Sequence, residues 1–267
     1  MSVRLRNNVT VSGTGPVTLL FAHGFGCDQV VWRFMTPAFA ARYRIVTFDL
    51  VGSGKSDLAA YDRARYGALQ AHAEDLLEII DEIGGPVVYI GHSVSAMIGL
   101  LAGIQAPERF LGQVMIAPSP CYVDEGDYRG GFSRGDIDEL LETMEANYLG
   151  WSSSMAPVIM GAPNQPHLGI ELTNSFCRND PDIARHFGRV TFLSDHRADL
   201  EHATVPTLII QCSDDLIAPV EVGDYLQQKL AGSQLRRVRN IGHCPHLSAP
   251  AECVRLTQAF LDELEPA

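Results

Sequence analysis

The sequence has no long apolar run. None of the apolar stretches in its 267 residues approaches the roughly 18 residues of a membrane-spanning helix. The first residues, MSVRLRNNVTVSG, also lack the apolar core of a secretory signal peptide. No internal repeat, low-complexity tract or Gly/Ser-rich linker interrupts the chain. We therefore expect a cytoplasmic globular protein with no membrane partner.

Positive charge and paired cysteines are also scarce. Lys and Arg number 20 against 32 Asp and Glu, which gives a formal net charge of −12. This balance argues against a nucleic-acid partner, because such partners require clustered basic residues. The cysteines have neither the spacing of a disulfide framework nor that of a zinc site. We expect reduced thiols, no metal and no cofactor. The cysteines are Cys27, Cys121, Cys177, Cys212, Cys244 and Cys253.

What the chain does have is a series of short apolar runs rich in β-branched residues. Each run is bounded by Gly, Pro or a polar residue, as is typical of strands buried on both faces. Helical patterns alternate with the runs, for example in residues 76–83 and 253–264. This alternation predicts an α/β fold with a mostly parallel sheet and helices on both faces. The expected strands are residues 17–23, 43–49, 86–92, 112–118 and 206–212.

One region breaks the alternation. Residues 118–197 contain no convincing strand, whereas residues 137–148 follow helical spacing and Pro181 stands near the first turn of another helix. Helices inserted between two strands would cover the end of the sheet at which ligands bind. We predict a core made of residues 1–117 and 198–267, with residues 118–197 as a helical cap.

The stretch YIGHSVSAM (89–97) lies between an apolar run and a helical pattern. A serine at such a junction lies on a tight, strained turn that exposes its hydroxyl. The residues two before and two after it must be small. Gly91 meets this requirement, and Ser95, in place of the glycine of G-x-S-x-G, adds only a hydroxymethyl group. Ser93 is therefore the candidate nucleophile and Ser95 a packing residue. On this stretch alone, a small-residue crossover of helix on strand explains the pattern equally well.

A serine nucleophile requires a base and an acid that orients the base. In α/β-hydrolases the chain order is Ser, acid, His. Asp214 and Asp215 follow the expected strand 206–212, and NIGHCPHLSAP supplies His243 and His246. The serine, an acid and a base would thus meet at one end of the sheet. The order predicts a triad and leaves the choice within each pair open.

The oxyanion of such a reaction needs two preorganised N–H donors. HGFG (23–26) follows a strand, so the Phe25 amide is one candidate, and the Val94 amide, directly after the nucleophile, is the other. VGSGKSD (51–57) invites a phosphate-loop interpretation, but Asp49 stands where that motif needs its first glycine. We interpret it as a turn after a strand.

Several motifs together identify a family. HGFG followed by QVVW, GHSVSAM, NYLGW and GHCPHLSAP resemble those of the α/β-hydrolase superfamily, and within it the RsbQ-like subgroup of bacterial stress-signalling hydrolases. The chain is equally similar to the plant strigolactone and karrikin receptors. The resemblance covers essentially the whole chain, and serine at position 95 is itself a mark of this subgroup. It implies the α/β-hydrolase fold.

The resemblance assigns roles within the open pairs. It places the nucleophile on Ser93, the acid on Asp215 and the base on His243. Asp214 is then a solvated neighbour and His246 a loop or packing residue. It also implies an apolar pocket over the nucleophile, for which we choose the aromatic residues Phe25, Trp151, Phe176 and Phe192.

The implied function is a serine hydrolase of the carboxylic-ester type. It would cleave small apolar esters or butenolide-like lactones and signal through a protein partner that contacts the cap. The alternative is a metabolic carboxylesterase or carbon–carbon bond hydrolase without a partner. An intact triad argues against a purely binding protein. A serine argues against dehalogenases and epoxide hydrolases, which need a carboxylate at this position.

Overall fold

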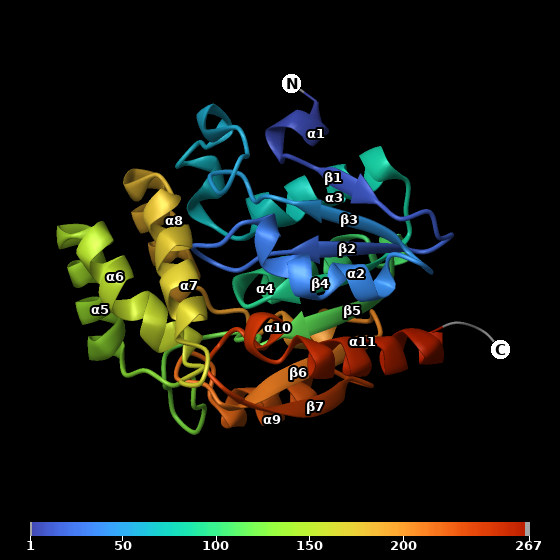
Figure 1. The fold of residues 1–267 in the computed structure, drawn as a ribbon. Helices are drawn as coiled ribbons and strands as arrows, with labels where there is room; N and C mark the ends of the chain where they lie inside the picture. Colours follow the sequence, from blue (N-terminus) through green and yellow to red (C-terminus); the bar gives the residue numbers. More distant parts are fainter. Residues whose placement is uncertain (1, 265–267) are drawn as a thin grey trace.

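A computed structural model describes residues 2–264. Within these residues seven strands form one sheet, in the order β1-β3-β2-β4-β5-β6-β7. β1 pairs antiparallel with β3, and the other neighbours are parallel (Figure 1). The predicted α/β-hydrolase fold is confirmed. The strands are β1 (Thr10–Ser12), β2 (Thr18–Ala22), β3 (Arg44–Phe48), β4 (Val87–His92), β5 (Phe110–Ile116), β6 (Thr207–Asp214) and β7 (Gln234–Ile241).

Helices cover both faces of the sheet. Alternate strand residues such as Leu20 and Tyr89 belong to one apolar cluster with α3 (Gln70–Ile83), α4 (Val94–Gln105) and α9 (Val220–Lys229). Their neighbours Leu19 and Val88 belong to the other, with α2 (Thr36–Phe39) and α11 (Pro250–Leu264). Every residue of β2 and β4 is consequently buried, which explains their continuous apolar sequence. Within residues 2–264 every helix is too short or too polar to cross a bilayer.

The remaining helices outside the inserted region 118–197 are short. They are α1 (Val3–Arg6), η1 (Gln29–Phe34), η2 (Leu58–Ala60), η3 (Arg65–Gly67), η4 (Pro107–Arg109), η5 (Leu200–His202) and α10 (Pro245–Ser248).

The two outer strands carry the weakest sequence signal. β1 is short and all three of its residues are exposed, so it has no apolar pattern. β7 buries only Val238 and Asn240 along its length. Edge strands commonly expose one side and one edge to water, which removes the continuous apolar run of a central strand. The five predicted strands all occur in the structure, with ends that differ by no more than two residues from those expected.

Between β5 and β6 the chain forms α5 (Arg134–Ala146), α6 (Tyr148–Met160), α7 (Pro166–Arg178) and α8 (Pro181–Phe192). These helices lie beyond the carboxyl ends of the strands (Figure 1). The helical pattern expected over 137–148 divides at Asn147, whose non-helical backbone ends α5 and whose side chain accepts the Gly150 N–H to begin α6. We keep the name cap for residues 118–197.

The strand order creates the place for a site. β2 connects to β3 on one side of the sheet, whereas β4 connects to β5 on the other. The crevice between β2 and β4 is therefore a topological switch point, where α/β sheets bind their ligands. The loops that follow β2 and β4 border this crevice, and the cap lies over it.

Candidate active site

Ser93 occupies the turn between β4 and α4. Its backbone has φ 55° and ψ −122°, a strained conformation for a residue with a side chain. The turn requires glycine at position 91, because a Cβ there would lie 2.6 Å from the Ser95 carbonyl oxygen. The Ser93 N–H donates to the Ile116 carbonyl at 2.9 Å, which holds the turn against β5. The hydroxyl of Ser93 thus projects above the end of the sheet.

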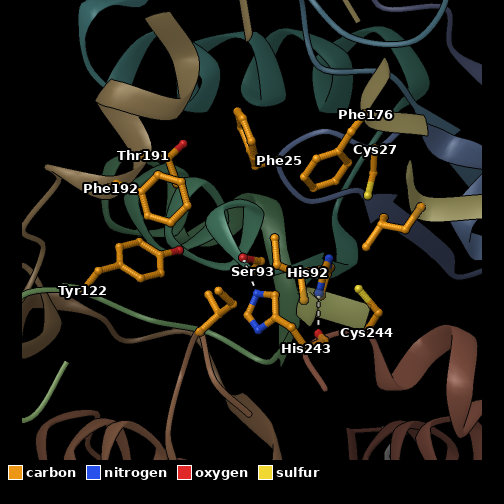
Figure 2. A pocket seen from close by; sticks show the side chains of 13 residues that line it. Phe25, Cys27, His92, Ser93, Tyr122, Phe176, Thr191, Phe192, His243 and Cys244 are labelled. Atoms are coloured by element: carbon orange, nitrogen blue, oxygen red, sulfur yellow. Dashed lines mark hydrogen bonds between the residues drawn. The ribbon is translucent and has the colours of Figure 1, made fainter. Parts of the chain in front are cut away.

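Three of the predicted residues form one hydrogen-bonded chain. His243 Nε2 lies 2.8 Å from Ser93 Oγ (Figure 2). On the other side of the ring, His243 Nδ1 lies 2.7 Å from Asp215 Oδ2. The other Asp215 oxygen accepts the N–H groups of Ile217 and Ala218 at 2.9 and 3.2 Å. These bonds orient the carboxylate so that its Oδ2 accepts the N–H of His243, which fixes the proton of His243 on Nδ1. His243 Nε2 is then free to accept the serine proton.

A second histidine supports this arrangement. His92 precedes Ser93 and donates from Nε2 to the His243 carbonyl at 2.9 Å, so β4 holds the histidine loop as well as the serine (Figure 2). Burial lowers the pKa of His92 well below its usual value, with smaller contributions from His246 and His243. His92 is therefore a neutral donor at physiological pH.

Asp214 and His246, the alternatives to Asp215 and His243, lie outside this chain of hydrogen bonds. Asp214 is exposed at the end of β6, where its carbonyl accepts the Gly242 N–H at 2.7 Å. His246 is fully buried, with ring centroids 4.8 Å from Trp32 and 4.3 Å from His92. Among the described residues neither ring nitrogen of His246 has a hydrogen-bond partner, and burial lowers its pKa to about 3. His246 packs as a neutral aromatic ring.

The loop after β2 lies against the serine turn. A Cβ on Gly24 would come within 2.5 Å of His92 Nδ1 and 3.3 Å of Ser93 Cβ, so only glycine allows this approach. Phe25 is the next residue. Val94 is the first residue of α4, and its N–H has no acceptor within that helix. The assignment of the Phe25 and Val94 amides as oxyanion donors stays a prediction that this approach supports.

Ser95 does more than occupy space. Its hydroxyl donates to the His23 carbonyl at 2.5 Å, and its own carbonyl accepts from the Tyr89 hydroxyl at 2.9 Å. The first bond joins the serine turn to the loop that carries Phe25. The substitution of serine for the usual glycine was the only sign of this link in the sequence.

A small cavity of about 30 Å³ lies above Ser93, roughly enough for two water molecules. Three of the four aromatic residues chosen from the sequence, Phe25, Phe176 and Phe192, line it (Figure 2). Trp151 does not: it lies behind Phe176, stacked at 5.9 Å between ring centroids, and borders a separate outer groove. Its assignment to the substrate-binding residues stays a prediction, and in this structure Trp151 supports the lining ring of Phe176. The other lining residues are Cys27, His92, Ser93, Tyr122, Ile159, Leu172, Thr191, Ile217, His243 and Cys244.

The lining cysteines are buried thiols. Burial is the largest cause that raises the pKa of Cys27, to about 12, and that of Cys244 well above its usual value. Both remain protonated and are poor nucleophiles or metal ligands. Within residues 2–264 no group of three or more His, Cys, Asp or Glu side chains is arranged to hold a metal ion.

The VGSGKSD segment wraps a carboxylate. Asp49 is buried at the end of β3 and accepts the N–H groups of Gln29 and Lys55 at 2.8 and 2.9 Å. A Cβ on Gly54 would lie 2.6 Å from the Asp49 carboxylate. The loop interior is thus filled by a negative side chain, which agrees with a turn and leaves no place for a phosphate.

Comparisons with known proteins agree with this geometry. Residues 19–256 match the family described as the alpha/beta hydrolase family. The strigolactone esterase D14 of Arabidopsis thaliana is 40% identical over 256 residues, 95% of this chain and 96% of that protein. The karrikin insensitive 2 receptor CA of Petunia hybrida is 40% identical over 246 residues, 91% of each. A solved structure of a hydrolase from Oleispira antarctica has 41% identity and a TM-score of 0.95, and covers 97% of this chain and 96% of that one. The predicted resemblance to the plant receptors is confirmed, and the chain belongs to the alpha/beta hydrolase family.

Proposed function

We propose that the protein is a serine hydrolase that cleaves small apolar esters or butenolide-like lactones with Ser93, His243 and Asp215. The observation that carries this proposal is the buried chain of hydrogen bonds from Asp215 through His243 to the Ser93 hydroxyl. Serine alone is a weak nucleophile, and this chain supplies both the base and the group that orients it. Its members come from loops after three different strands, which converge only in the folded protein.

The mechanism follows from the same distances. His243 Nε2 takes the Ser93 proton as Oγ attacks the substrate carbonyl, and the Phe25 and Val94 N–H groups stabilise the oxyanion. When the tetrahedral intermediate collapses, the leaving alkoxide takes that proton from His243. A water then attacks the acyl group on Ser93, His243 takes the water's proton, and the proton returns to Oγ as the acid leaves.

The cavity supports an apolar substrate. Its lining consists mostly of aromatic and aliphatic side chains, with no Lys or Arg among them. Together with the net charge of −12, this disfavours an anionic ligand. The names of the relatives, a strigolactone esterase and a karrikin receptor, point to the same class of compact esters and lactones.

The size of the cavity suggests how signalling would arise. At about 30 Å³ it is far smaller than the roughly 300–1,000 Å³ of pockets that hold small molecules. The side chains that close the cavity must therefore move to admit a ligand, and several of them belong to helices α6–α8 of the cap. We extend the proposal to a sensor hydrolase in which the ligand-bound position of the cap presents a surface to a protein partner. The receptor among the relatives supports this extension.

The direct test is labelling of the serine. A fluorophosphonate probe should form a covalent adduct on Ser93, located by peptide mass spectrometry, and nitrophenyl acetate should be hydrolysed slowly. Ser93→Ala should form no adduct and lose activity by up to about a millionfold, as for triad nucleophiles generally. An adduct on another residue, or unchanged hydrolysis by Ser93→Ala, would refute the mechanism.

A further inference from the structure

Thr191 carries a buried hydroxyl without a partner. The residue lies at the end of α8 and is 1% exposed, yet its Oγ1 makes no hydrogen bond among the described residues. Threonine in a helix often bonds a carbonyl three or four residues earlier, and Ser194 nearby does so, donating to the Thr191 carbonyl at 2.7 Å. The Thr191 hydroxyl does not use this option, although burial without a partner costs free energy.

A ligand in the cavity would supply the missing partner, because Thr191 lines the cavity. Figure 2 places Thr191 beside Phe192, with its oxygen on the side toward Phe25 and across the cavity from Cys27. The neighbouring rings at this end are those of Phe25 and Phe192, which offer no strong acceptor or donor, whereas the Tyr122 hydroxyl is directed toward Ser93. A polar atom that enters this end of the cavity would therefore meet one hydrogen-bonding group.

The other unpartnered polar atom of the lining is different. His92 Nδ1 also lacks a hydrogen bond within the described part of the chain. It lies against the backbone of Gly24, where even a single added methyl carbon would come within 2.5 Å. A ligand atom has no room to reach it. Among the described lining residues, Thr191 is thus the side chain that can form a hydrogen bond with a polar atom of the ligand at the end of the cavity away from Ser93.

We infer that Thr191 is a specificity-determining residue that donates a hydrogen bond to a second oxygen of the ligand. The inference rests on the proposed function: Ser93 attacks one carbonyl, and Thr191 selects esters or lactones with a carbonyl or ether oxygen farther along an otherwise apolar body. A ligand without this oxygen leaves the hydroxyl buried and unpaired, which lowers its affinity.

The test compares two esters that differ by one atom. Nitrophenyl hexanoate and its methoxybutanoate isostere have the same shape, but an ether oxygen replaces one methylene. Binding of both is measured by calorimetry in a Ser93→Ala background, so that neither is consumed. The protein with Thr191 should bind the ether about 5-fold more tightly than the hexanoate, as expected for one net hydrogen bond.

Two variants at position 191 decide the outcome. Thr191→Val keeps the shape, removes the hydroxyl and should abolish the preference; Thr191→Ser keeps the hydroxyl and should retain it. A matching melting temperature verifies that each variant is folded. Equal affinity for both esters with Thr191 present, or a preference that survives in Thr191→Val, overturns the inference.

The same experiments separate a failure of the hydrolase proposal from a failure of the inference about Thr191. If the protein with Ser93 hydrolyses neither ester but the preference for the ether depends on Thr191, the hydrolase proposal fails and the selectivity of Thr191 stands. If both esters are hydrolysed but Thr191→Val has the same preference as the parent, the hydrolase proposal stands and the inference about Thr191 fails.

Discussion

The Ser95 hydroxyl donates a hydrogen bond to the His23 carbonyl at 2.5 Å. Ser95 lies in the first turn of α4 and His23 directly follows β2, so this bond connects the serine turn with the loop that brings Phe25 over Ser93. A glycine at position 95 would permit the same turn but could not make the bond. The serine that departs from the general motif thus acts on the placement of the candidate oxyanion donor.

Removing that bond should lower turnover more than binding. In Ser95→Gly the His23 carbonyl loses its donor, the loop becomes less well fixed, and we expect kcat for a nitrophenyl ester to fall about tenfold. The expected fall is smaller than the hundred- to thousandfold fall in kcat that follows complete loss of one oxyanion donor, because the Phe25 N–H is displaced and not removed. KM should change little. Steady-state kinetics with the melting temperature as a folding control would measure it, and an unchanged kcat in folded Ser95→Gly would remove Ser95 from this role.

Adjacent aspartates should behave differently. Asp215→Asn removes the carboxylate that holds the proton on His243 Nδ1, and we expect kcat to fall by about ten thousandfold, as for the equivalent change in other triads. Asp214→Asn is the matched control, because Asp214 is exposed and, within the described residues, no hydrogen bond or ion pair joins its side chain to His243. It should retain kcat within about twofold. Single-turnover kinetics of both variants compare the chemical step, and equal losses would contradict the assignment of Asp215.

Acid should destabilise the protein through its buried neutral histidines. His72 is fully buried between Tyr66 and Phe187, with ring centroids at 4.7 and 4.9 Å, and burial lowers its pKa to about 3. Arg65 and His23 add smaller contributions in the same direction. In the unfolded chain a histidine has a pKa of about 6.5. As pH falls below about 6.5 the unfolded state binds a proton that the folded state does not, so stability is lost on acidification down to about pH 3.

The contribution of His72 to this loss of stability can be measured by itself. Between about pH 7 and 5 a single such histidine should cost about 2 kcal/mol of unfolding free energy. His72→Phe keeps an aromatic ring without the titration, so its unfolding free energy should fall by about 2 kcal/mol less than that of the parent. Urea unfolding at both pH values provides the measurement, with exposed His167→Phe as the control. Equal losses in the parent and His72→Phe would contradict the assigned pKa.

Ligand binding should alter the cap. The cavity is too small for an ester in the present position of its lining side chains, several of which belong to the cap, so we expect a covalent adduct on Ser93 to displace part of residues 131–192. We expect hydrogen exchange to change in these helices but not in β4 or β5. The free energy that couples ligand binding to the position of the cap is about 1–3 kcal/mol. Ser93→Ala treated with the same reagent is the control. Unchanged exchange, together with no partner retained by the adduct, would favour the metabolic carboxylesterase or carbon–carbon bond hydrolase.

Local features of the sequence determined much of this protein. Runs of apolar residues predicted five central strands, because a strand buried on both faces needs an apolar residue at nearly every position. The small residues around Ser93 predicted the turn, since its steric limits act within five residues. The order of serine, acid and histidine predicted which loops would meet. The first two signals are short-range, and the structure contains the five strands and the turn at Ser93.

The tertiary structure decided what depends on packing between distant segments. Nothing local distinguishes Asp214 from Asp215, and only the position of His243 separates them; the resemblance to a family had to make that choice in advance. Trp151 and Thr191 lie on neighbouring helical segments of the cap, yet Thr191 reaches the cavity and Trp151 does not. Which face of a cap helix points inward is set by how it docks over the sheet, through contacts with residues far away in the sequence. The hydrogen bond from Ser95 to His23 spans 72 positions for the same reason.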